Sequence, residues 1–123
     1  MQIYVLSVDI TYEHGSNHDT GRYNHHVTIP AADITDAFSV ASDFVERYHA
    51  YYKHLGDYAL SASLSLQKPL FASRYELTEF FTWSARSEVD LTHKAVETPT
   101  KKTHEATFTT ILTLAELRES LKT

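Results

Sequence analysis

The chain has 123 residues, a formal net charge of −5 and no cysteine. Its length is typical of one domain, so we expect residues 1–123 to fold as a single unit. Without cysteine the chain forms no disulfide, no cysteine-ligated metal site and no thiol nucleophile, and such a composition fits a reducing compartment. No segment reaches the roughly 18 apolar residues of a membrane-spanning helix. We therefore expect a soluble cytoplasmic protein that is not attached to a membrane.

The negative charge is concentrated in the N-terminal half. Residues 1–67 hold eight acidic and three basic residues, whereas residues 68–123 hold eight of each. Nucleic-acid binding needs clustered lysine and arginine, so this distribution argues against direct contact with nucleic acid. It favours a protein partner that has a basic surface.

Two strands are predicted at the start of the chain. Apolar and polar side chains alternate over residues 4–12 and again over residues 23–29, and a period of two is typical of a strand with one buried face. The short connection between them contains Gly15, so we expect an antiparallel hairpin. Pro30 should end the second strand.

A long amphipathic helix follows. Its apolar stripe repeats at alternating spacings of four and three residues, as a helical face does. The members of this stripe are Ile34, Phe38, Ala41, Val45, Tyr48, Tyr52 and Leu55. Asp33 is the predicted N-cap, with Asp36 in the first turn where a carboxylate favours the helix dipole. Gly56 should end the helix as its C′ residue.

Alternation resumes after the helix. Strands are predicted at residues 58–66 and 74–83, although a short helix over residues 71–80 is an alternative for the second. After a connection at residues 87–92, a last hairpin is predicted from residues 93–98 and 104–111.

The sequence Thr-Leu-Ala-Glu at residues 113–116 is a capping box and predicts a short C-terminal helix. The predicted order is therefore β-β-α-β-β-(β)-β-α. Strands with one apolar and one polar face are typical of antiparallel sheets. The fold class predicted is α+β, a two-layer sandwich of one long amphipathic helix packed on an antiparallel sheet.

Histidine is the unusual residue type, with eight copies in the chain. Four of them gather with an acidic residue around the first hairpin, in the set His14, His18, Asp19, His25 and His26. Imidazole and carboxylate groups are ligands of Zn²⁺ and similar divalent metals. We expect no cofactor, and a metal site at this hairpin is the alternative.

Known catalytic arrangements are missing from the sequence. Three glycines cannot build a glycine-rich phosphate loop, and there is no His-Glu-x-x-His helix. We therefore expect a non-enzymatic protein that binds another protein, as an accessory, inhibitor or immunity-type factor. Its predicted contact residues are Asp36, Asp43, Glu46, Tyr51 and Phe80.

Two other functions remain open at this point. One is a small histidine-based hydrolase, a nuclease or phosphodiesterase, that uses the histidines of residues 14–26. The other is a self-assembling structural subunit in which an exposed strand edge pairs between copies, so that the protein forms a homo-oligomer.

Overall fold

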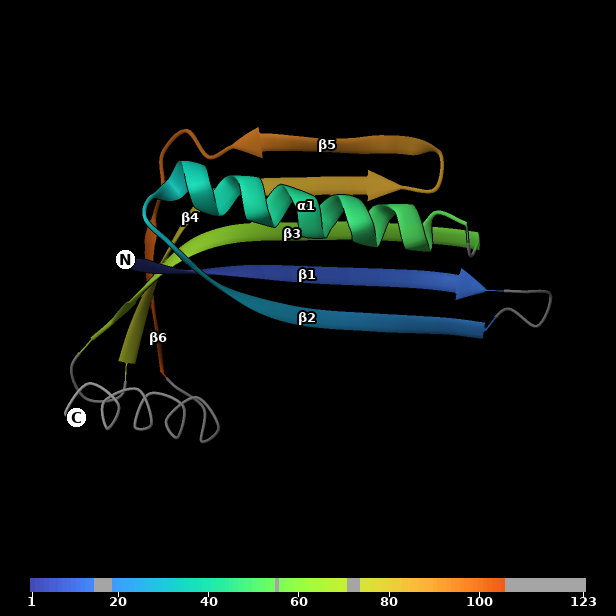
Figure 1. Cartoon of the computed structure of the whole chain (residues 1–123). Helices are drawn as coiled ribbons and strands as arrows, with labels where there is room; N and C mark the ends of the chain where they lie inside the picture. Colours follow the sequence, from blue (N-terminus) through green and yellow to red (C-terminus); the bar gives the residue numbers. More distant parts are fainter. Residues whose placement is uncertain (15–18, 55, 71–73, 106–123) are drawn as a thin grey trace, which may run out of the picture.

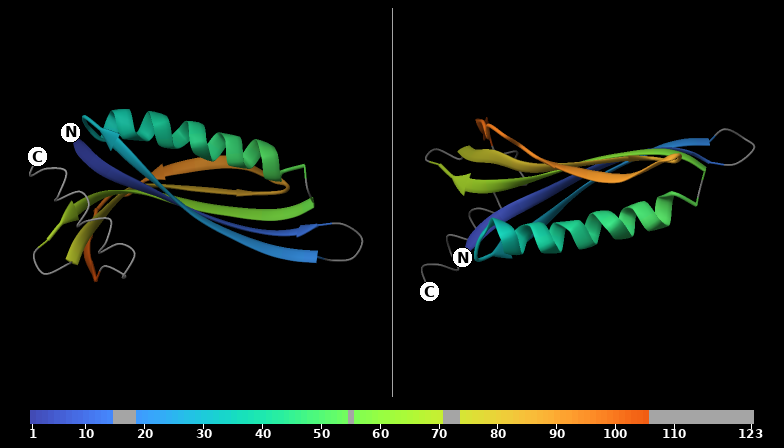
Figure 2. Two further views of the ribbon diagram at one scale, coloured as in Figure 1. Left: turned by 60° about the horizontal axis from the view of Figure 1, so that its bottom comes forward. Right: turned by 90° about the horizontal axis from the view of Figure 1, so that it is seen from above.

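The computed structural model describes residues 1–14, 19–54, 56–70 and 74–105, which form a six-stranded antiparallel sheet and one helix (Figure 1). The elements are β1 (Gln2–His14), β2 (Asp19–Ala31), α1 (Ile34–Tyr52), β3 (Gly56–Pro69), β4 (Arg74–Arg86), β5 (Val89–Ala95) and β6 (Lys101–Glu105). The strand order is β2-β1-β3-β4-β5, and β6 also pairs with β4. Figure 2 shows α1 lying along one face of the sheet. We call the opposite face, which no helix of the described part covers, the open face.

β1 is the central strand of the first half of the sheet. It pairs with β2 on one side and with β3 on the other, so the predicted hairpin of the first two strands is confirmed. Because successive strand residues point to opposite faces, its even-numbered residues share the α1 face. Four of these are at most 2 % exposed: Tyr4, Leu6, Val8 and Ile10. Pro30 does not end β2 as predicted, because the strand continues to Ala31, and proline is tolerated there because β2 is an edge strand.

α1 begins where the sequence predicts. The Asp33 side chain accepts a hydrogen bond from the backbone N–H of Asp36 at 3.0 Å, which confirms the N-cap. The helix ends at Tyr52, earlier than predicted, and Gly56 is the first residue of β3 rather than a C′ glycine. Lys53 supplies the C-cap, with its backbone N–H bonded to the carbonyl of His49. The last predicted member of the stripe, Leu55, lies outside the described residues.

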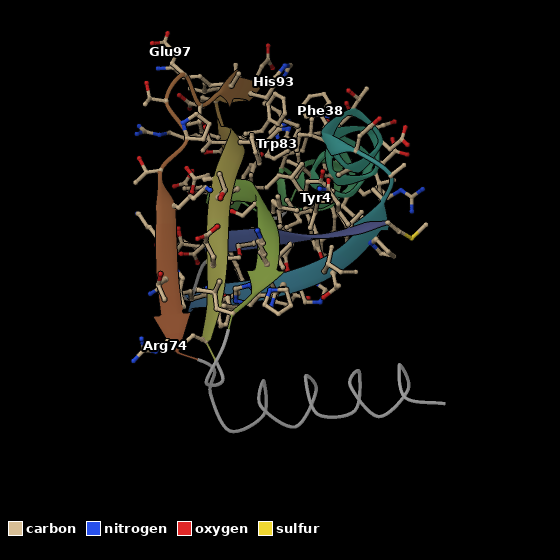
Figure 3. The ribbon with its side chains drawn as sticks, turned by 90° about the vertical axis from the view of Figure 1, so that its left-hand side faces the viewer. Tyr4, Phe38, Arg74, Trp83, His93 and Glu97 are labelled. Carbon is tan, nitrogen blue, oxygen red and sulfur yellow. The ribbon has the colours of Figure 1, made fainter. Side chains whose placement is uncertain are left out.

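Aromatic side chains join α1 to the second half of the sheet. The ring of Phe38 lies 4.4 Å from that of Phe81 and 5.6 Å from that of Trp83, measured between centroids. His93 of β5 is 5.2 Å away on the same side (Figure 3). With Trp83 only 4 % exposed, this cluster closes the core at the β4–β5 end of the sheet.

Two further strands pair with different parts of β4. Its C-terminal part pairs with β5 and its N-terminal part with β6. The register with β3 shifts between the two parts, and Phe80 is the extra residue of this bulge. A bulge bends a strand and increases its twist, and Figure 1 shows β6 running at a steep angle to β5.

The predicted pairing of residues 93–98 with residues 104–111 is not seen within the described part of the chain, and residues 106–111 lie outside it. β5 and β6 pair with β4 instead of with each other, because the two parts of a bent 13-residue strand each offer a free edge. The connection predicted at residues 87–92 is also shorter, since β5 begins at Val89. The alternative of a helix at residues 71–80 is wrong, because β4 begins at Arg74. The predicted C-terminal helix lies outside the described residues.

An α+β fold with one long helix on an antiparallel sheet is thus confirmed. Within the described part, no helix combines the length and apolar character that crossing a bilayer requires.

Candidate functional site

The side of α1 turned away from the sheet carries three exposed carboxylates. Ala37, Ala41 and Val45 are fully buried against the sheet, so residues about half a turn from them point to solvent. These include Asp36, Asp43 and Glu46, all exposed, which we call the acidic helix surface.

No ion pair neutralises this surface within the described part of the chain. The ion pairs Arg22–Asp9 and Lys101–Glu76 do not involve these carboxylates. The i, i+4 spacing of Asp43 and Arg47 would allow an ion pair, but the two side chains do not approach within the 4.0 Å of a salt bridge. The three carboxylates are therefore open to a partner.

Tyr51 lies in the last turn of α1, five residues after Glu46. Its side chain is 65 % exposed, and its ring touches that of Tyr52 at 5.0 Å between centroids. An exposed tyrosine offers a large apolar area and a polar hydroxyl at little cost in conformational entropy, and tyrosine is enriched at protein interfaces. The structure thus places four of the five predicted contact residues on one helix.

Phe80 is separate from them. It is a half-buried residue at the bulge of β4, where its carbonyl accepts a hydrogen bond from the backbone N–H of Val96 at 2.9 Å. A bulge accounts for its break in the alternation of apolar residues. Phe80 therefore has a structural explanation that does not require a partner.

A tyrosine cluster fills the space between β2 and the end of α1. The ring centroid of Tyr23 lies 6.2 Å from that of Tyr48 and 6.3 Å from that of Tyr52. The ring centroid of Tyr12 lies 5.6 Å from that of Tyr52. Burial and the neighbouring tyrosines raise the pKa of both Tyr48 and Tyr52. Tyr48 and Tyr52 therefore stay neutral at physiological pH, and each offers an apolar ring and a hydroxyl group.

The two adjacent histidines of β2 point to opposite faces of the sheet. The Nδ1 atom of His25 is hydrogen-bonded to the Oη atom of Tyr48 of α1. His26 lies on the open face, where its Nδ1 atom is 2.9 Å from the Oγ atom of Ser7. These two side chains cannot bind one metal ion together.

The rest of the predicted metal site falls partly outside the described structure. The backbones of His14 and Asp19 face each other at the end of the β1–β2 pair, but their side chains are not described, and His18 lies outside the described residues. Among the described side chains there is no group of three or more histidine and carboxylate residues that could hold a metal. The metal site stays a prediction.

The open face is lined with small hydroxyl residues. A groove of about 300 Å³ crosses it between the floor of β1 and β3 and the β5–β6 connection. Its lining residues are Ser7, Ser63, Ser65, Leu77, Glu79, Val96, Thr98, Thr100, Lys102 and His104. Beside it, Arg22 donates two hydrogen bonds to Asp9, at 2.8 and 3.1 Å, and these bonds lower the pKa of that carboxyl group.

The Ser7–His26 pair resembles the start of a nucleophilic site, in which a base must reach a hydroxyl. Acyl transfer also needs donors for the developing oxyanion, usually backbone N–H groups. β1 is paired on both sides along its length, so its N–H groups are engaged in the sheet. Ser7 and His26 are also direct cross-strand neighbours, which is sufficient to explain their hydrogen bond.

His49 is held between α1 and β3. Its Nδ1 atom is hydrogen-bonded to the Oη atom of Tyr58, which is 5 % exposed. Burial lowers the pKa of His49, and the charge of Lys53 lowers it further, while Asp90 acts in the opposite direction. His49 is therefore a structural residue, and it does not belong to the acidic helix surface.

Sequence reasoning missed the exposed apolar residues beside β2. Tyr23 is 37 % and Val40 is 42 % exposed, although the alternation placed Tyr23 in the core. Tyr23 is exposed because β2 is an edge strand. Val40 could have been found from its spacing, since it lies four residues before Phe44 and eight before Tyr48 on one side of the helix.

Comparison with known proteins adds no relative: no protein-family model, curated protein or solved structure matches this chain.

Proposed function

We propose that this protein is a non-enzymatic protein-binding factor, of accessory, inhibitor or immunity type, whose contact surface is the acidic helix surface with Tyr51. The observation that carries this proposal is the combination, on one rigid helix, of three exposed carboxylates that no described residue pairs with and a tyrosine that is 65 % exposed.

Such a combination has the composition of an interface. Aromatic anchors supply most of the binding energy at protein interfaces, and charges at their margins set the on-rate and the choice of partner. Because α1 is packed on the sheet through Ala37, Ala41 and Val45, its outer side is presented in a fixed geometry. The partner should have a basic surface, because desolvating carboxylates without a counter-charge is unfavourable.

The test is capture of partners from a lysate of the source organism by the immobilised chain. The variant Asp43→Lys with Glu46→Lys reverses the surface charge, and Glu88→Lys with Glu97→Lys is the matched control, since these exposed acids lie at the β4–β5 turn and beyond β5. We expect species that the wild type and the control retain to be lost from the first variant. Retention should also weaken with salt, because exposed charges are screened.

The same captured proteins with both variants and the wild type would contradict the proposal. A far-ultraviolet circular dichroism spectrum of each variant checks that the fold is unchanged, which is expected for exposed residues.

A further inference from the structure

The two edges of the sheet are built differently. β5 and β6 are 7 and 5 residues long, carry Lys94, Lys101 and Lys102, and border a bulged strand. β2 is 13 residues long, and its segment from Tyr23 to Ile29 contains no acidic residue, no lysine or arginine and no proline.

Short strands, lysines, prolines and bulges are the features by which proteins prevent an edge from pairing with another strand. The edge formed by β5 and β6 has short strands, lysines and a neighbouring bulge, whereas the middle of β2 has none of these features. An edge strand also presents unpaired backbone donors and acceptors, which a further strand satisfies in full.

Apolar side chains of α1 run along the same edge. Val40, Phe44 and Tyr48 follow each other at spacings of four, and the contacts of Tyr48 with Tyr23 and His25 show that this side of the helix faces β2. The large apolar side chains exposed in the described part are Met1, Tyr23, Val40, Tyr51 and Val89. Tyr23 lies on β2 and Val40 on the side of α1 that faces β2, next to an edge with which no further strand of the described part pairs.

We propose that two copies of this chain pair through β2 in an antiparallel, two-fold symmetric manner, so that their sheets become continuous. This inference does not depend on the carboxylates of the proposed partner surface, because Asp36, Asp43 and Glu46 lie on the side of α1 that faces away from the sheet.

A second copy fits this edge better than a charged partner does. A two-fold axis perpendicular to the sheet places both helices on the same face, so the Val40–Phe44 side of one helix faces that of the other. Such pairing also places side chains that point to the same face of the sheet opposite each other. When the pairing is centred on His26, Tyr23 lies opposite Ile29 and Asn24 lies opposite Thr28. The absence of fixed charge from Tyr23 to Ile29 allows this contact at neutral pH although each chain carries −5.

The first test is the mass in solution. Sedimentation equilibrium of the wild type at ~0.1 mM, far above a Kd of about 1 μM, should give twice the 14.0 kDa of one chain. The variant Asn24→Lys with Thr28→Lys brings like charges together across the pair and should be a monomer. Its matched control is Ser61→Lys with Thr92→Lys, which adds the same charge at exposed positions of β3 and β5 and should remain a dimer.

The second test locates the axis. The chain has no cysteine. A single cysteine introduced at one of residues 24–28 can therefore form a disulfide only with the same cysteine of a second copy. The residue on the two-fold axis faces its own copy at a Cα separation of about 4.5–5.5 Å, within disulfide range. We expect the variant His26→Cys to form a disulfide-linked dimer under mild oxidation, and the variant Thr92→Cys on β5 to remain unlinked.

A wild-type monomer at ~0.1 mM would overturn the proposal, as would a dimer that the β2 lysines leave intact or that Thr92→Cys links preferentially. These outcomes are independent of the lysate experiment, since Asp43→Lys and Glu46→Lys leave β2 unchanged and the β2 lysines leave the acidic helix surface unchanged.

Discussion

The surroundings of His49 favour its neutral imidazole. Its pKa lies below the ordinary value because burial and Lys53 disfavour its charge. In the unfolded chain His49 binds a proton near its ordinary pKa of about 6.5. The unfolded state therefore binds more protons in the range between the two pKa values, and stability rises with pH there.

We expect the contribution of His49 to be complete above about pH 6.5 and to be lost as the pH falls below it. The variant His49→Gln does not titrate, so its free energy of unfolding should fall less than that of the wild type between about pH 7.5 and about pH 5. Urea denaturation at both pH values measures this difference. Equal pH dependence in the two proteins would show that His49 is not perturbed.

The sequence alone could have excluded a metal site shared by His25 and His26. His25 and His26 are neighbours on a strand, and a period of two already sends them to opposite faces, as the bonds to Tyr48 and to Ser7 confirm. By contrast, no local pattern reveals that Tyr23 is 37 % exposed, because this depends on what lies beyond β2.

At the scale of elements, the start of α1 gives a sharp test. Asp33→Ala removes the acceptor for the N–H of Asp36 and should lower the free energy of unfolding by about 1 kcal/mol. Asp33→Asn keeps an acceptor oxygen and should recover most of this loss. Urea denaturation followed by circular dichroism measures both variants, and an Asn variant as unstable as the Ala variant would argue against capping.

Elements were predictable from the sequence where one periodicity continues without interruption. β1, β3 and α1 are of this kind, because each turns one constant face to the core. β5 and β6 were not, because their pairing is set by the bend of β4 at Phe80 and leaves most side chains of both strands exposed. The helix end was missed because Tyr52 and Leu55 continue the apolar spacing, although the helix stops at the first of them.

At the scale of the molecule, one core should make the described part unfold as a unit. Leu64 is fully buried at its centre, so Leu64→Ala should cost about 3 kcal/mol. Val89→Ala, at a position 54 % exposed, should change stability by less than about 0.5 kcal/mol.

The chain has one tryptophan, Trp83, which is buried beside Phe38. Its fluorescence reports on the core, while circular dichroism reports on the backbone. The two urea transitions should coincide in both variants, and separate transitions would contradict a single cooperative core.

The central position of β1 has a consequence for how the chain is made. Translation releases β1 before β3, yet Ile3 finds its partner Gln67 only when β3 has emerged. Until then a hairpin of two long strands keeps an apolar face and a free inner edge in water, and closing this distant pairing slows folding. The nascent chain is therefore most prone to aggregate, and most dependent on chaperones, during the interval in which the helix has been synthesised and the third strand has not.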